Sequence, residues 1–247
     1  MGRTYEALEW AEKETQGTSQ RGNADFLVEG RSEVIPAALV SPFGEQYEDL
    51  KINLLTRYPD GSITTILITG TNSGEGTSTT AINLAAALAR DANLKVLLID
   101  VNLRRPGLHG ILQVDNRHGV LDLFAGNGRG VSPIRVGPGN LDIIPCGGQH
   151  DDPATLFKSD GFDQFLSVAR DGYDYVILDG PPVQGFSECR ILCPKVDGVV
   201  LVIRSGKIRR EVALSAKRQL EDAGGKILGI VLNRRKFYIP EFIYRWL

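Results

Sequence analysis

The sequence predicts an α/β fold in which a mostly parallel sheet is sandwiched between helices. From residue 63 onward, short apolar segments alternate with longer segments of helical periodicity, which is the rhythm of βαβ units. Most of the short segments are near-continuous apolar runs, as expected of strands that helices cover on both faces. A glycine-rich loop follows the first of them and opens a helix, and such a loop is suited to binding phosphate groups.

The individual elements follow from periodicity and capping residues. An amphipathic helix is predicted over residues 4–15, and a polar, irregular stretch follows to residue 40. Ser41 and Pro42 are typical of a helix start, with serine as the cap and proline in the first turn. We predict strands at 65–69, 95–100, 141–145, 175–179, 198–203 and 227–232. The predicted helices of this region are 41–58, 78–90, 163–169 and 210–223.

The length of 247 residues suits one α/β domain with short appendages. We predict a short N-terminal helix plus flexible linker over 1–40, one α/β domain over 41–236, and a tail over 237–247. The tail places Tyr238 and Tyr244 among apolar and aromatic residues, which disfavours a freely solvated segment. It is expected to dock on its own domain, on a partner or on a membrane surface, or else to pack as a C-terminal core element.

Composition limits the classes of protein that fit. Three cysteines are too few for a disulfide framework, so small buried residues are expected. No apolar run is long enough to span a membrane, and the N-terminus lacks a hydrophobic signal core. We therefore expect a cytoplasmic protein. With a net charge of −2 no nucleic-acid partner is expected, while the basic C-terminal part is compatible with peripheral contact to an anionic membrane.

The loop between the first strand and its helix carries the main functional signal. Gly74 and Gly76 allow the backbone to curl so that successive N–H groups face inward, next to a helix N-terminus. Ser78 stands where a hydroxyl that binds Mg²⁺ is expected. We predict that this loop binds ATP or ADP with Mg²⁺. The residues that point to this role are Gly74, Gly76 and Ser78.

Thr77 departs from the usual phosphate-loop pattern, which ends in Gly-Lys-Ser/Thr. The lysine normally reaches the β- and γ-phosphates and offsets their charge during transfer. Losing one such pre-aligned group commonly lowers the rate by roughly 10²–10³. The sequence therefore predicts a retained loop with weakened nucleotide binding and weak or absent turnover.

Polar residues end three of the apolar strands. Asp100 and Asp179 both lie at strand C-termini, where α/β folds gather ligands, and each is a candidate for holding a Mg²⁺-bound water. Taken alone, either aspartate is equally typical of a turn or a helix cap. Asn233 ends the last strand and is a candidate for contacting a nucleobase, although an asparagine there is also a common turn residue.

Several ordered motifs together resemble the bacterial tyrosine-kinase family, a branch of the Min/Par-type deviant-Walker P-loop ATPases. The resemblance runs from about residue 41 to the C-terminus. The segments that carry it are GEGTSTTAINLA, LLIDVNLRRPGLH, YDYVILDGPPV and GIVLNRRKFYIPEFIYRWL.

The resemblance implies roles for individual residues. The family's second motif is Asp-x-Asp, and its aspartates assist metal binding and catalysis. Here the first is Asp100 and the second has become Asn102, while the Walker B aspartate matches Asp179. These three are the candidate catalytic residues, and Ser78, Asp100 and Asp179 are the candidate metal ligands. The resemblance makes Gly74, Glu75, Gly76, Thr77, Ser78 and Thr79 the candidate cofactor-binding residues, with Asn233 at a position that contacts adenine. It also implies that the domain over 41–236 is P-loop ATPase-like or kinase-like.

The resemblance also implies partners. Family members assemble as rings with a membrane-embedded polysaccharide co-polymerase, or chain-length protein, and phosphorylate tyrosines in one another's tails during capsule or exopolysaccharide synthesis. Tyr238 and Tyr244 are the candidate phosphoacceptors. The ring contact uses a Glu-x-x-Arg-x-x-Arg helix, and the matching residues here are Glu45, Glu48 and Lys51. The resemblance therefore implies that the chain can form a homo-oligomer and that a partner can hold it at the inner face of the membrane.

Three functions are compatible with these residues. The first is a degenerate family member that regulates polysaccharide assembly by contact, because Thr77 and Asn102 each remove a charge from the site. The second is an active tyrosine autokinase that offsets the phosphate charge with another cation, such as Arg104 or an arginine of a neighbouring subunit. The third is a partition or positioning ATPase of the same superfamily.

Overall fold

The computed structural model describes residues 44–124, 131–137 and 139–234. The predicted helix at 4–15, the linker and the tail with Tyr238 and Tyr244 lie outside the described residues. Strands are β1 (Thr65–Gly70), β2 (Val96–Asp100), β3 (Ile134–Arg135), β4 (Leu141–Ile144), β5 (Tyr175–Asp179), β6 (Gly198–Arg204) and β7 (Ile227–Asn233). Helices are α2 (Gly44–Arg57), α3 (Thr77–Ala89), α4 (Leu108–Leu112), η2 (Val120–Phe124), α5 (Pro153–Phe157), α6 (Asp160–Gly172), α7 (Glu188–Leu192), η3 (Cys193–Lys195) and α8 (Arg210–Asp222).

The strands form one sheet of seven, in the order β3-β4-β2-β5-β1-β6-β7. All neighbours pair in parallel except the two-residue edge strand β3, which runs antiparallel to β4. The carboxyl ends of β1, β2 and β5 therefore meet at one edge of the sheet, where parallel α/β folds gather ligands. The predicted mostly parallel sheet is confirmed.

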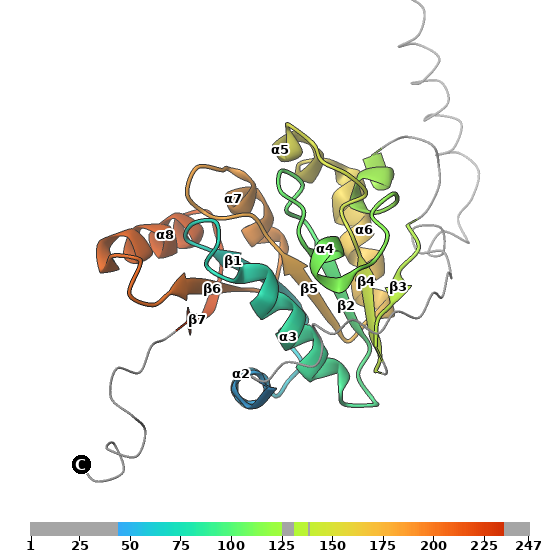
Figure 1. The fold of residues 1–247 in the computed structure, drawn as a ribbon, viewed down its shortest axis with the longest axis horizontal. Helices are drawn as coiled ribbons and strands as arrows, with labels where there is room; N and C mark the ends of the chain where they lie inside the picture. The colour runs from blue at the N-terminus through green and yellow to red at the C-terminus, as the bar shows by residue number, and fades with distance from the viewer. Residues whose placement is uncertain (1–43, 125–130, 138, 235–247) are drawn as a thin grey trace, which may run out of the picture.

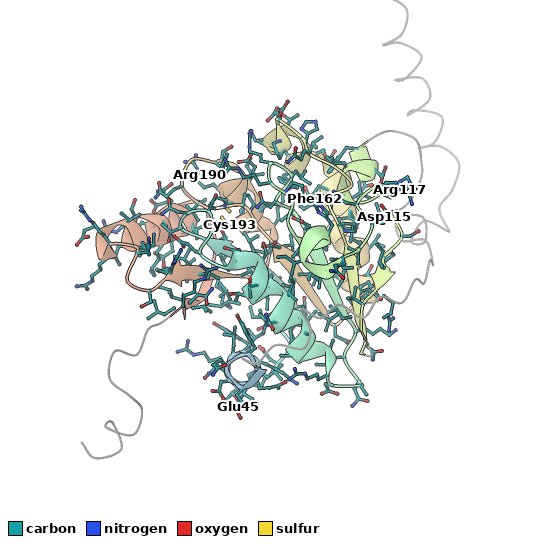
Figure 2. All side chains as sticks on the ribbon, in the orientation of Figure 1. Glu45, Asp115, Arg117, Phe162, Arg190 and Cys193 are labelled. Carbon is teal, nitrogen blue, oxygen red and sulfur yellow. The ribbon has the colours of Figure 1, made fainter. Side chains whose placement is uncertain are left out.

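Helices cover both faces of this sheet (Figure 1), and each face has its own apolar cluster. On one face, side chains of α6, α7, η3 and α8 pack on the sheet; they include the buried Phe162 of α6 and Cys193 of η3, which Figure 2 labels. On the other face α3 and α4 pack on the sheet, and α2 packs against α3 with Glu45 exposed at its outer side. The predicted sandwich of helices around the sheet is thus confirmed.

The strand predictions agree with the structure to within one residue at each end. Helix α6 is longer than predicted, because it begins at Asp160 and ends at Gly172, where the sequence pattern indicated only 163–169. The short helices α4, α5 and α7 and the strand β3 were not predicted. Each has five residues or fewer, which is too short for a periodic pattern to develop. All three cysteines are buried and free, as expected.

Candidate nucleotide-binding site

The loop that joins β1 to α3 has the backbone shape that its glycines predicted. Gly74 and Gly76 adopt positive φ angles of 80° and 94°, a region that glycine enters without steric cost. Gly76 is also the residue that precedes the first turn of α3. No side chain caps this helix start, so the N–H groups of its first turn are available to an anion.

Glu75 shapes this loop from within. Its carboxylate accepts hydrogen bonds from the backbone N–H groups of Thr71 (2.9 Å) and Asn72 (3.0 Å). The side chain is buried, and burial raises the pKa of the carboxyl group while these backbone N–H groups oppose the rise. Glu75 was a candidate cofactor-binding residue; the structure places its side chain inside the loop, behind the surface that a ligand would contact.

A pocket of about 290 Å³ opens beside the loop. It contains most of the predicted loop residues and also Asn102 from the segment after β2. The residues that line it are Asn72, Ser73, Gly74, Gly76, Thr77, Ser78, Thr79, Asn102, Arg105, Ile111, Gly180, Pro182 and Arg234. The sequence motifs that are far apart in the chain therefore meet at one cavity.

Asp100 and Asp179 end neighbouring strands and are partners in the register of β2 and β5. The Asp100 carboxylate accepts hydrogen bonds from the backbone N–H groups of Asn102 (3.1 Å), Gly107 (3.0 Å) and Leu108 (3.1 Å). Burial raises its pKa, and the same three N–H groups oppose that rise. Asp100 therefore holds the segment after β2 and the start of α4 in place, in the manner of a helix cap.

Asp179 has a different environment. It is buried, and neither carboxylate oxygen accepts a hydrogen bond of good geometry in the described part of the chain, although the Ser78 hydroxyl lies close enough to affect its pKa. Its pKa is raised well above the ordinary value, first by burial and then by the negative charge of Asp100, against a smaller opposing effect of the Ser78 hydroxyl. Two unpartnered carboxylate oxygens near a serine hydroxyl are the ligand chemistry that Mg²⁺ prefers. The residues present therefore fit a magnesium ion held by Ser78 and Asp179.

The two positions that depart from the family pattern lie at the pocket itself. Thr77 lines it, and its hydroxyl is turned toward the base of the loop, since a Cβ built on Gly70 would lie 2.7 Å from Thr77 Oγ1. Asn102 also lines the pocket, while its backbone N–H is bonded to Asp100. Neither side chain carries a charge, and both line the same cavity.

Asn233 contacts the phosphate loop directly. Its side-chain Nδ2 donates a hydrogen bond of 2.8 Å to the backbone carbonyl of Glu75, and its Oδ1 accepts one of 2.8 Å from the N–H of Arg234. A Cβ on Gly76 would lie only 1.9 Å from Asn233 Nδ2. Asn233 thus fixes the position of the loop, while its contact with a nucleobase stays a prediction.

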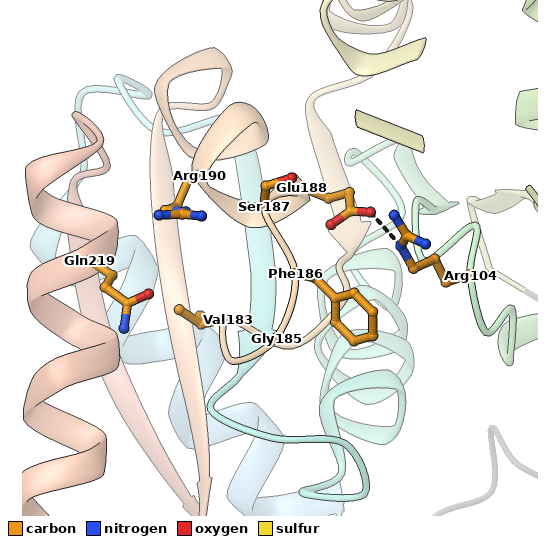
Figure 3. Close-up of a pocket in the computed structure, with 8 residues that line it drawn as sticks. All are labelled: Arg104, Val183, Gly185, Phe186, Ser187, Glu188, Arg190 and Gln219. Carbon is orange, nitrogen blue, oxygen red and sulfur yellow. Dashed lines mark hydrogen bonds and ion pairs between the residues drawn. The ribbon is translucent and has the colours of Figure 1, made fainter. Parts of the chain in front are cut away.

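The two consecutive arginines after β2 have separate environments. Arg104 forms an ion pair with the buried Glu188, with Nε 2.6 Å from Oε1, and lies over the ring of Phe186. Figure 3 shows these residues at a second pocket of about 450 Å³, where Arg190 and Gln219 line another part of the wall. Arg105, which the sequence reasoning did not single out, lines the phosphate-loop pocket instead. No local motif distinguishes the two residues, and only the fold separates them.

The geometry defines a P-loop nucleotide-binding domain, and comparison with known proteins agrees. Residues 66–237 match the family model for the CobQ/CobB/MinD/ParA nucleotide binding domain, so the chain belongs to that family. None of the helices in the described residues has the length and apolar character needed to cross a membrane.

Individual relatives show to which branch of this family the chain belongs. The chain is 34% identical to the tyrosine-protein kinase YwqD of Bacillus subtilis over 193 residues, which is 78% of this chain and 81% of the relative. It is 33% identical to the tyrosine-protein kinase CpsD of Streptococcus agalactiae, over 68% and 74% of the two chains. The kinase domain of the Escherichia coli tyrosine kinase ETK superposes with a TM-score of 0.72 at 26% identity, covering 94% of this chain and 88% of that one. This protein is a member of the bacterial tyrosine-kinase family.

Proposed function

We propose that this chain is a degenerate tyrosine-kinase-family protein of capsule or exopolysaccharide assembly, which binds ATP or ADP with Mg²⁺ but transfers phosphate slowly or not at all. One observation carries this proposal: a formed phosphate-loop pocket is lined by Thr77 and Asn102 at the two positions where the family has lysine and aspartate. The fold and the loop support binding, and the two substitutions support weak transfer.

Each part of the site has a separate role in the proposed function. The free N–H groups at the start of α3 and in the loop bind the phosphate oxygens. Ser78 and Asp179 would hold the metal ion, which would neutralise part of the phosphate charge. Thr77 is too short to reach the γ-phosphate and has no charge, so it does not stabilise the charge that develops on transfer.

The partner that we propose is a membrane-embedded polysaccharide co-polymerase, which would hold the chain at the inner face of the membrane. Contact between copies through α2 would differ from the family's usual ring contact. Glu48 stands where the family has an arginine, and within this chain it pairs with Arg90 (2.8 Å) and Lys51 (3.6 Å). The relatives that carry the name tyrosine kinase support this branch over a partition or positioning ATPase.

Phosphotyrosine analysis of the purified protein tests the proposal. The native protein and a Thr77→Lys/Asn102→Asp double variant are incubated with ATP and Mg²⁺, and Tyr238 and Tyr244 are followed by mass spectrometry. We expect little or no transfer by the native protein and a gain of at least ~10²-fold in the variant, since one pre-aligned cation alone commonly contributes that much. Transfer by the native protein at the rate of the double variant would instead support an active autokinase.

A further inference from the structure

The charged side chains that line the phosphate-loop pocket are basic, although the loop itself lacks a lysine. Thirteen described residues line it, and the only charged side chains among them are Arg105 and Arg234. The nearby acidic residues Glu75, Asp100 and Asp179 are all buried behind the lining. A triphosphate that enters the pocket therefore meets two guanidinium groups and no exposed carboxylate among these lining residues.

Arg105 is held at the pocket by the turn that follows β2. Its backbone N–H donates to the carbonyl of Asn102 at 3.0 Å, and Asn102 is itself fixed by the Asp100 carboxylate. The side chain is exposed, and it forms no ion pair with another described residue. Its neighbour Arg104 has no such freedom, because it is paired with Glu188 at the other pocket (Figure 3).

Arg234 lines the pocket from the end of β7, whereas Arg105 follows β2, and these two strands lie on opposite sides of β1 in the sheet. It adopts a φ of 55°, which is uncommon for a residue with a side chain and is found in structures at functional sites. Its N–H is bonded to Asn233, whose side chain is bonded to Glu75 in the loop. The backbone that carries Arg234 is thus tied to the phosphate loop itself.

We propose that Arg105 and Arg234 supply the positive charge that the loop lacks at Thr77, by binding the β- and γ-phosphates of ATP from two sides. A guanidinium group remains charged at all relevant pH values and binds two phosphate oxygens at once. Two such groups on different elements compensate for a point charge that would otherwise come from position 77. This inference rests on the proposed nucleotide binding and adds the residues that make it possible.

The experiment is a calorimetric titration of ATP and of ADP, in Mg²⁺, into five proteins. These are the native chain, Arg105→Gln, Arg234→Gln, the double variant, and Arg218→Gln as the matched control. Arg218 is an exposed arginine on α8 that does not line the pocket, so this substitution removes the same charge elsewhere. Thermal unfolding of each protein confirms that it folds.

We expect each single pocket variant to bind ATP roughly 10-fold to 100-fold more weakly, as for the loss of one charge-assisted hydrogen-bonding group. The double variant should bind still more weakly, ADP should be affected less than ATP, and the control should match the native chain. Adding Thr77→Lys to the double variant should restore much of the lost affinity. If the folded double variant bound ATP as tightly as the native chain, the role of the two arginines would be overturned, while the proposed function would stand. No ATP binding by the folded native chain would overturn the proposed function as well.

Discussion

The side-chain amide of Asn233 at the end of β7 donates a 2.8 Å hydrogen bond to the carbonyl of Glu75, 158 residues earlier in the chain. The edge strand and the phosphate loop are thereby joined at the point where phosphate would bind. Glu75 in turn holds the N–H groups of Thr71 and Asn72. The loop is therefore fixed both from its interior and from its outer side.

Asn233→Ala should loosen the loop without unfolding the protein. One partly buried hydrogen bond contributes about 1 kcal/mol, so we expect a loss of that size in stability and a several-fold loss in ATP affinity. Asn233→Asp should lose more of both stability and ATP affinity, because a carboxylate would face the Glu75 carbonyl. Hydrogen exchange of the loop amides and ATP titration measure the two effects. Unchanged exchange in both variants would show that the contact does not hold the loop.

Comparing the stabilities of Gly76→Ala and Gly74→Ala separates the effect of backbone strain from the effect of a steric clash. Both glycines have positive φ, which costs a residue with a Cβ about 1–2 kcal/mol. Only at Gly76 would the new Cβ also collide, 1.9 Å from Asn233 Nδ2, whereas nothing lies within 4 Å of it at Gly74. We expect Gly76→Ala to lose about 1–3 kcal/mol more in urea unfolding. Equal losses in the two variants would contradict the close approach of Asn233.

Asp179→Asn should stabilise the nucleotide-free protein as the pH rises. The folded-state pKa of Asp179 lies well above its ordinary value because of burial and the charge of Asp100. The folded state therefore binds the proton more tightly, so the stability contribution is full below the unfolded pKa and is lost as the pH rises through the folded pKa.

Thermal unfolding from pH 4 to pH 8 measures this effect. We expect Asp179→Asn to exceed the native protein in stability at neutral pH, and the difference should shrink as the pH falls below the folded-state pKa of Asp179. Asp171→Asn, at an exposed position on α6, is the control and should follow the native profile. A native-like profile for Asp179→Asn would show that the buried carboxylate is not destabilising.

Arg104→Gln should cost more stability than Glu188→Gln. Removing Arg104 leaves the Glu188 carboxylate buried without its cation, and its Oε2 already lacks a hydrogen-bond partner among the described residues. Removing the carboxylate leaves Arg104, which is one-third exposed and can be hydrated. Because Arg104 is partly exposed, water weakens the ion pair, and we expect Arg104→Gln to lower the free energy of unfolding by about 2–3 kcal/mol. Denaturant unfolding of the two variants measures both losses. A larger loss for Glu188→Gln than for Arg104→Gln would contradict the burial of Glu188.

The sequence predicted the parts of this molecule that depend on local patterns. Continuous apolar runs located six of the strands, and the glycines at 74 and 76 predicted the loop because only their backbone can take its shape. The strand-end positions of Asp100 and Asp179 also followed, since parallel strands end at one edge of a sheet. These inferences need only the order of residues along a few turns or strands.

Contacts between distant segments could not be obtained in this way. The pairing of Arg104 with Glu188 joins residues 84 positions apart, and nothing local indicates that Arg105 instead faces the phosphate loop. The carboxylates of Asp100 and Asp179 look alike in sequence, yet one is satisfied by three backbone N–H groups and the other by none among the described residues. Their difference arises from the packing of α4.

The central claim is that this pocket binds nucleotide although Thr77 has replaced the phosphate-loop lysine. Calorimetric titration of ATP with Mg²⁺ into the native protein and into Thr77→Lys tests it most directly. We expect measurable binding by the native protein and roughly 10-fold to 100-fold tighter binding by the variant, which gains one charged phosphate contact. Absence of binding by the folded native protein, with binding by Thr77→Lys, would contradict the claim and show that the loop has lost its ligand along with its lysine.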